Sequence, residues 1–175
     1  MPNADEDALR AMRAASTMLQ KWWPEDRSPR SWEAVTWSGD RVQGLDLNVT
    51  GLEVLAPQIG QLTALTKLDL RGCPLKELPP QIGQLTELTS LNLDRCPLLE
   101  ELPPQIGQLT ALTELYLYGC PLKELPPQIG QLTALTELSL RGCPLKELPP
   151  QIRKLTALTV LYTLPTARGR SCRPR

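Results

Sequence analysis

Four cysteines recur at an almost constant spacing and are the first residues in the chain that could do chemistry. They are separated by 23, 24 and 23 residues: Cys73, Cys96, Cys120 and Cys143. A zinc site needs cysteines in close pairs that converge on one point, whereas this spacing places one thiol in each repeating unit. The chain has no His, so imidazole-activated nucleophiles and His-ligated metals are excluded. We therefore expect the four thiols to be buried, reduced and structural, and we predict no metal and no cofactor.

Neighbouring carboxylates are the second candidate chemistry. Glu114 and Glu137 hold equivalent places in successive units. Glycoside hydrolysis uses two carboxylates in an enclosed cleft, and an open stack of repeats offers no such enclosure. Basic and acidic residues number 19 each, which excludes the whole-chain basic field of a nucleic-acid-binding protein. The sequence predicts that the protein is not an enzyme and that it has no nucleic-acid partner.

A repeating unit of 23 residues positions these side chains. Full units cover residues 62–84, 85–108, 109–131 and 132–154, with a weaker unit at 39–61 and a partial unit from 155. The first half, L-x-x-L-x-L, places Leu68 and Leu70 on one side of an extended strand. The second half carries consecutive prolines, which exclude a helix interior and leave room for only a short turn. One unit cannot bury its leucines alone, so we expect the units to stack into a solenoid.

The unit resembles the leucine-rich repeat, whose core L-x-x-L-x-L-x-x-N/C-x-L is matched by LTKLDLRGCPL. LPPQIGQL resembles the 23-residue Ras-group subtype, and the 24-residue unit with CPLLEELP resembles plant disease-resistance receptors. The resemblance implies an α/β solenoid. Its parts would be a curved stack with a parallel β-sheet on the concave side, short turns or 3₁₀ segments on the convex side, and a helical N-terminal cap.

The two ends of the stack differ from the repeats. We expect a cap over residues 1–38, a solenoid of about five and a half repeats over 39–164, and a basic disordered tail over 165–175. One helix is predicted over residues 4–23, ended by Pro24. The following SWEAVTWSGDRV resembles the plant-type cap of leucine-rich repeat proteins, with Trp37 in place of its cysteine. We expect all four tryptophans to plug the end of the stack: Trp22, Trp23, Trp32 and Trp37.

The outward positions of the predicted strands vary between units, while most other positions are nearly identical. Tyrosine and arginine, which dominate binding hot spots, are among the residues there. The alternative is a cross-strand charge row on which the tyrosines stack. The predicted binding residues on the concave face are Lys67, Asp69, Arg71, Asn92, Asp94, Glu114, Tyr116, Tyr118, Glu137 and Arg141.

These observations predict a non-enzymatic interaction module that binds a protein or an extended peptide on the concave face. By resemblance, it would serve intracellular signalling or immune recognition. Two alternatives are a consensus-like scaffold without an evolved partner and an ice-binding protein, because threonines recur in two rows that begin at Thr63 and Thr66.

The acidic N-terminus and the lack of a long apolar stretch predict a cytoplasmic protein without a membrane partner. The partial unit at the end predicts a monomer, or a weak end-to-end dimer through Leu158, Leu161, Tyr162 and Leu164.

Overall fold

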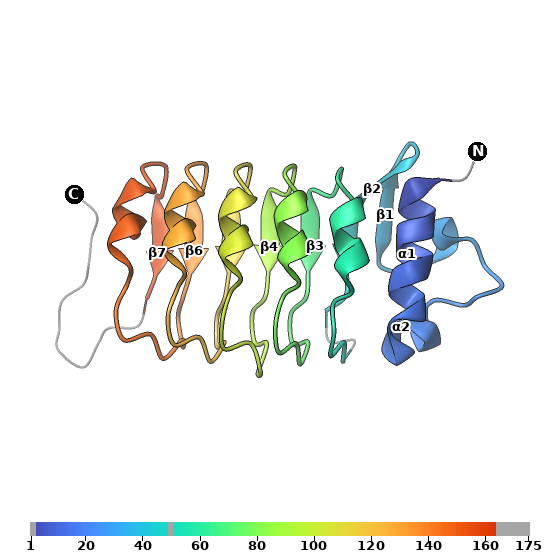
Figure 1. The fold of residues 1–175 in the computed structure, drawn as a ribbon, viewed down its shortest axis with the longest axis horizontal. Helices are drawn as coiled ribbons and strands as arrows, with labels where there is room; N and C mark the ends of the chain where they lie inside the picture. The colour runs from blue at the N-terminus through green and yellow to red at the C-terminus, as the bar shows by residue number, and fades with distance from the viewer. Residues whose placement is uncertain (1–2, 49–50, 164–175) are drawn as a thin grey trace.

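Each repeating unit contributes one short strand to a single sheet (Figure 1). The structure is a computed structural model that describes residues 3–48 and 51–163. Six strands pair in parallel and in chain order, and β1 (Val35–Ser38) pairs with β2 in antiparallel fashion. The register joins equivalent residues of successive units. The parallel strands are β2 (Arg41–Asp46), β3 (Lys67–Asp69), β4 (Ser90–Asn92), β5 (Glu114–Tyr116), β6 (Glu137–Ser139) and β7 (Val160–Tyr162).

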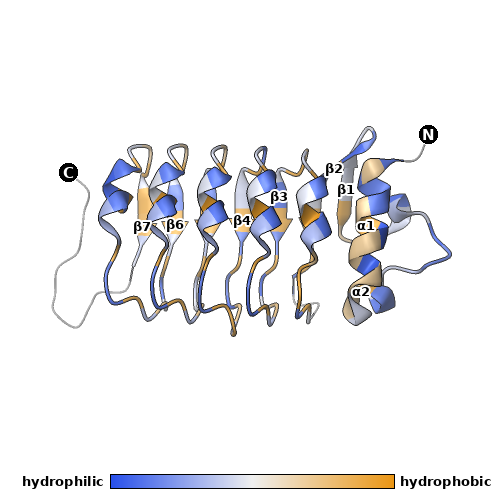
Figure 2. Cartoon of the chain, viewed as in Figure 1, coloured by the Kyte–Doolittle hydropathy of each residue, from blue (hydrophilic) through white to orange (hydrophobic). Residues whose placement is uncertain are grey.

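The convex side consists of short 3₁₀ turns that follow the prolines. Each turn has Pro at its first position, where the missing N–H is not needed, and ends after five residues. Figure 2 shows hydrophilic residues along these turns and hydrophobic residues at the strands behind them. The predicted α/β solenoid with convex 3₁₀ segments is confirmed. The turns are η2 (Pro57–Gln61), η3 (Pro80–Gln84), η4 (Pro104–Gln108), η5 (Pro127–Gln131) and η6 (Pro150–Lys154).

Leucine and isoleucine ladders form the core between the strands and the turns. Leu91, Leu115 and Leu138 are fully buried and stack in register along the sheet. The third residue of each turn is an isoleucine. Ile106 in η4 is fully buried, whereas Ile152 in η6 is half-buried. The core is therefore closed along the stack and opens beside η6 and β7.

Polar side chains join neighbouring units inside this stack. The Thr89 hydroxyl donates to the Thr66 carbonyl oxygen at 3.0 Å. The Cys96 thiol donates to the Leu70 carbonyl at 3.2 Å, and Cys120 does the same to Leu93 at 3.0 Å. These bonds recur along the described units and satisfy backbone groups that bend out of the sheet. None of the four thiols forms a disulfide, and Cys73, Cys96 and Cys120 are buried as predicted. Cys143 is only half-buried, because it lies in the last full unit, where the core opens.

The N-terminal cap differs from the prediction in two respects. The single helix predicted over 4–23 is two helices, α1 (Ala4–Ala14) and α2 (Thr17–Trp22). Ser16 adopts an extended conformation and its hydroxyl accepts the Leu19 N–H, so it begins α2 as an N-cap. Trp22, at the end of α2, is 45% exposed and does not plug the stack, contrary to the prediction.

The other tryptophans cover the end of the solenoid. Trp23 and Trp32, which precede and follow the short turn η1 (Pro29–Ser31), are buried and stack with their ring centroids 4.8 Å apart. Trp37 packs against the core and is partly buried. Helix α1 contacts η2, as a further repeat would. In the described part of the chain the longest helix has 11 residues, and none could span a lipid bilayer.

The facing of β5 can be tested with two neighbouring truncations. Leu117 is fully buried, so Leu117→Ala should lower the free energy of unfolding by about 2–5 kcal/mol. Tyr116 is partly exposed, so Tyr116→Ala should cost less than about half as much. Urea denaturation measures both changes, and equal losses would show that the assignment of inward and outward faces is wrong.

The concave face as candidate functional site

The concave face consists of the outward side chains of β3 to β7 and of the positions just after them. Strand pairing aligns them in columns, because Lys67, Ser90, Glu114 and Glu137 are register partners in succession. A second column runs through Asp69, Asn92 and Tyr116. The structure thus brings the predicted site residues onto one surface. Arg71, Asp94, Tyr118 and Arg141 continue the pattern beyond the strands.

Two of the charged side chains at the β3 end of this face, Arg71 and Asp69, are paired with each other. Arg71 forms an ion pair with Asp69, with 2.8 Å between Nη2 and Oδ2. Lys67 is exposed and makes no ion pair within the described residues. A hollow of about 260 Å³ opens beside Lys67.

Sequence reasoning missed the β2 part of this hollow. Asp46 lines it together with Thr36 and Gly44. The sequence feature that could have indicated it is the run GLDLNV, in which Asp46 is equivalent to Asp69 in KLDLRG. The weaker spacing of the first unit concealed this equivalence.

Asp94 is occupied by the fold rather than free for a ligand. Its carboxylate accepts the Tyr118 N–H of the next unit at 2.7 Å. Burial raises the pKa of the Asp94 carboxyl, while this hydrogen bond and Arg71 act in the opposite direction. The Asn92 side chain likewise accepts the Asp94 N–H at 3.0 Å. The side chains of Asp94 and Asn92 therefore stabilise the backbone of this face and have fewer hydrogen-bond acceptors left for a ligand.

Two glutamates stand side by side at the boundary of β5 and β6. Glu114 and Glu137 are register partners on adjacent parallel strands and are both half-buried. No cation pairs with either carboxylate among the residues the structure describes. The Tyr116 hydroxyl donates to Glu137 at 3.1 Å. Like charges directly opposite each other destabilise a sheet, so this pair is an uncompensated negative spot.

An exposed aromatic ring lies further along the same unit, four residues after Glu114. Tyr118 is 37% exposed, and the Arg95 guanidinium lies 5.6 Å from the centre of its ring. Arg95 was not predicted as a site residue. It adopts a φ of 57° at a place where three other units have glycine, as in RGC and YGC against DRC. A non-glycine residue in this left-handed region is strained, and such strain is often found at functional positions.

The Cys143 thiol is held in its protonated form. Burial raises the pKa of the Cys143 thiol to about 12, so the thiol stays protonated near neutral pH. Within residues 3–48 and 51–163, no cluster of three metal-ligating side chains forms.

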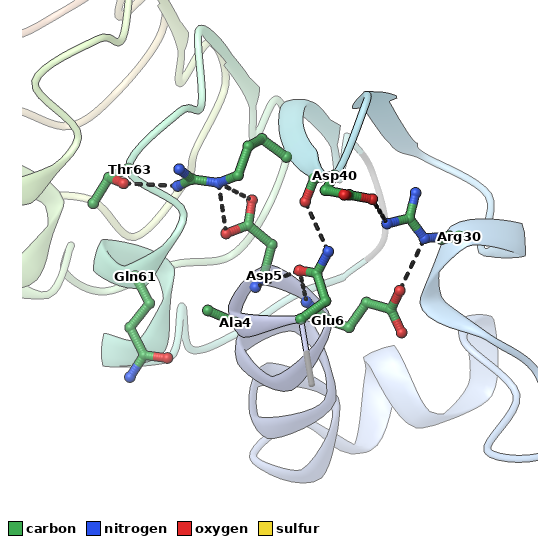
Figure 3. A pocket seen from close by; sticks show the side chains of 9 residues that line it. Ala4, Asp5, Glu6, Arg30, Asp40, Gln61 and Thr63 are labelled. Carbon is green, nitrogen blue, oxygen red and sulfur yellow. Dashed lines mark hydrogen bonds and ion pairs between the residues drawn. The ribbon is translucent and has the colours of Figure 1, made fainter. Parts of the chain in front are cut away.

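A second hollow, of about 560 Å³, lies where α1 meets β2 and η2 (Figure 3). Its charged groups bind one another. Asp5 is 1% exposed and accepts the Val42 N–H at 2.7 Å and Arg41 Nε at 3.1 Å. Arg30 contacts both Glu6, at 2.9 Å, and Asp40, at 2.6 Å. These contacts attach the cap to the first units, so this hollow is a structural joint.

One strand and one convex turn per unit, stacked in register around a leucine core, define a solenoid repeat protein. The leucine-rich repeat region model matches residues 42–120, and the leucine-rich repeat model matches residues 111–132 and 134–155. The chain is therefore a leucine-rich repeat protein. No curated protein matches the chain.

Solved structures with the same architecture include a leucine-rich repeat protein of Leptospira interrogans, 37% identical over 66% of this chain and 35% of the other, with a TM-score of 0.58. A plant ice-binding protein is 27% identical over 93% of this chain and 56% of the other, with a TM-score of 0.73. The structure of PEPR1–AtPEP1 is 26% identical over 93% of this chain and 24% of the other, with a TM-score of 0.75. The chain thus spans about a third of the length of the Leptospira protein and about half of the length of the plant ice-binding protein.

The ionisation of Tyr116 reports on the acidic spot. Burial, followed by the hydrogen bond to Glu137, raises the pKa of Tyr116 from 10.0 to about 12. The stability that comes from the neutral phenol should be complete below pH 10 and should be lost as the pH rises toward 12. Tyr116→Phe should remove the latest-titrating component from the tyrosinate absorbance. Glu137→Gln should move this component to lower pH, and an unchanged titration would contradict the assigned contact.

Proposed function

We propose that this protein is a non-enzymatic interaction module that binds a protein or peptide on its concave face. The observation that carries the proposal is the uncompensated pair Glu114 and Glu137, which lies next to Tyr116 and on the same face as the exposed ring of Tyr118. A sheet of nearly identical units could place a neutral or oppositely charged residue at either position, as Lys67 and Ser90 show in the same column. Retaining two like charges there costs stability and provides a site for an opposite charge.

The partner's chemistry follows from this surface. A lysine or arginine side chain lying between the two carboxylates would remove their repulsion. The neighbouring ring of Tyr116 would supply a cation–π face, and the exposed ring of Tyr118 would supply apolar contact further along the partner. The partner is therefore an extended segment or a loop with a cationic side chain. The PEPR1–AtPEP1 complex, which has the same fold, supports a role in binding. A cytoplasmic location and a role in signalling or immune recognition remain part of this proposal.

Charge reversal separates the proposed site from general electrostatics. Partners captured by the intact protein and identified by mass spectrometry should bind at least about tenfold more weakly, or about 1.4 kcal/mol, to Glu114→Lys/Glu137→Lys. The matched control is Glu124→Lys/Glu147→Lys, which makes the same charge change at exposed positions outside the sheet. Affinity should also fall with added salt. Equal weakening by both double variants would contradict binding on the concave face.

Ice binding is a second candidate function, favoured by the likeness to the plant ice-binding protein. The row that begins at Thr63 is exposed along the edge of the stack, in residues Thr63, Thr86, Thr110, Thr133 and Thr156. The row that begins at Thr66 is less suited, because its hydroxyls donate to backbone carbonyls. Thermal hysteresis that is abolished by Thr110→Lys would support this candidate, and its absence in the intact protein would exclude it.

A weak end-to-end dimer is proposed through the side chains at the β7 end. Leu158 and Leu161 are half-buried there and Tyr162 is 50% exposed, whereas the equivalent Leu135 and Leu138 are fully buried. Leu164 and the predicted tail at 165–175 lie outside the described residues. Sedimentation equilibrium over a concentration series should show association that Leu161→Glu abolishes, and a strict monomer would exclude it.

A further inference from the structure

The convex turns are held together through glycine. Each of Gly60, Gly83, Gly107 and Gly130 is the fourth residue of a PQIGQ turn. Figure 1 shows these turns side by side along the convex side. None of the four glycines has a positive φ, so their backbone conformation does not require glycine. The reason for glycine must lie in the space around it.

That space is filled by the next turn of the stack. A Cβ on Gly107 would lie 2.7 Å from the Gln128 carbonyl oxygen and 2.9 Å from the Gln128 Cβ. For Gly130 the equivalent distances to Gln151 are 2.6 and 2.8 Å. Real Cβ atoms do not approach backbone so closely, and backbone cannot turn aside as a side chain can. Close stacking of successive turns therefore requires glycine at this position.

The turn η6 has no glycine at this position. Its sequence is PQIRK, with Arg153 in the place of Gly130. Arg153 is exposed, and η6 packs against η5 on its other side. The Arg153 Cβ thus occupies the position where the backbone of another turn would have to lie.

We propose that Arg153 is a built-in stop that prevents a further turn from stacking on η6. The stop acts on any turn of the PQIGQ type at the spacing of the stack, whether it belongs to an added repeat or to a second copy arranged head to tail. At the opposite end, α1 covers η2 and prevents the same arrangement. The inference is independent of the proposed partner, because it rests on backbone distances alone. It also restricts the proposed end-to-end contact to the β7 side of this end.

The stop can be tested by adding a repeat to the full-length chain. A copy of residues 109–131 is inserted between Lys154 and Leu155, in the natural background and in Arg153→Gly. Each inserted chain is compared with its own uninserted parent, so the intrinsic effect of the substitution cancels. In the Arg153→Gly background, insertion should raise the urea midpoint, as expected when a solenoid gains one nearest-neighbour interface. With Arg153 retained, the rise should be less than half as large.

Two further measurements identify the cause. Amides of the inserted turn should exchange at least about tenfold faster with Arg153 than with glycine, because the turn is not packed. Arg153→Ala should behave like arginine, since the Cβ alone makes the clash. Equal midpoint rises with arginine and glycine would overturn the proposal. An alanine background that behaves like glycine would show that charge, rather than the Cβ, keeps the turn away, and would overturn the steric stop.

Discussion

Every unit of this protein must present its backbone to the next unit at the spacing of a parallel sheet, about 4.8 Å. The strands keep this spacing, and the convex turns of the same chain loops must also pack against one another along the stack. On the strand side it is met by backbone hydrogen bonds such as Leu93 N–H to Tyr116 O at 2.8 Å. On the convex side it is met by glycine, whose lack of a Cβ lets the next turn approach. The leucine ladders fill the space between these two fixed edges.

The same constraint explains why inward positions are uniform and outward positions vary. A side chain that points inward has an identical neighbour on each side, so a change in one unit disturbs two others. Threonine and cysteine persist at their positions because each donates to the carbonyl of the preceding unit, as Thr113 does to Thr89 at 2.9 Å. Apart from Asp94 and Asn92, which accept backbone N–H groups, the outward side chains of β4 to β6 have no such obligation. Charge and aromatic character at those positions are therefore free to serve a partner.

The ends of the stack solve a problem that the middle does not have. At one end, α1 and the stacked rings of Trp23 and Trp32 replace the missing neighbour, and Asp5 ties the helix to β2. At the other end, Arg153 prevents the turns from continuing, while Leu158 and Leu161 remain only half-buried. One end is closed by packing, and the other is limited by a single side chain.

The repeat period, the strand facing and the structural role of the cysteines could be read from the sequence, because in-register stacking turns sequence period directly into spatial neighbours. The predicted site residues of β3 to β6 came onto one surface for the same reason. Tertiary structure alone decided the break at Ser16, the exposure of Trp22 and the use of Asp94 by the Tyr118 N–H. These depend on local caps and on contacts across units, which a period cannot encode. Likewise, the sequence alone presents Arg153 as an ordinary surface charge. Its steric role depends on the distance between the equivalent glycine of one turn and the backbone of the next turn, which only the structure gives.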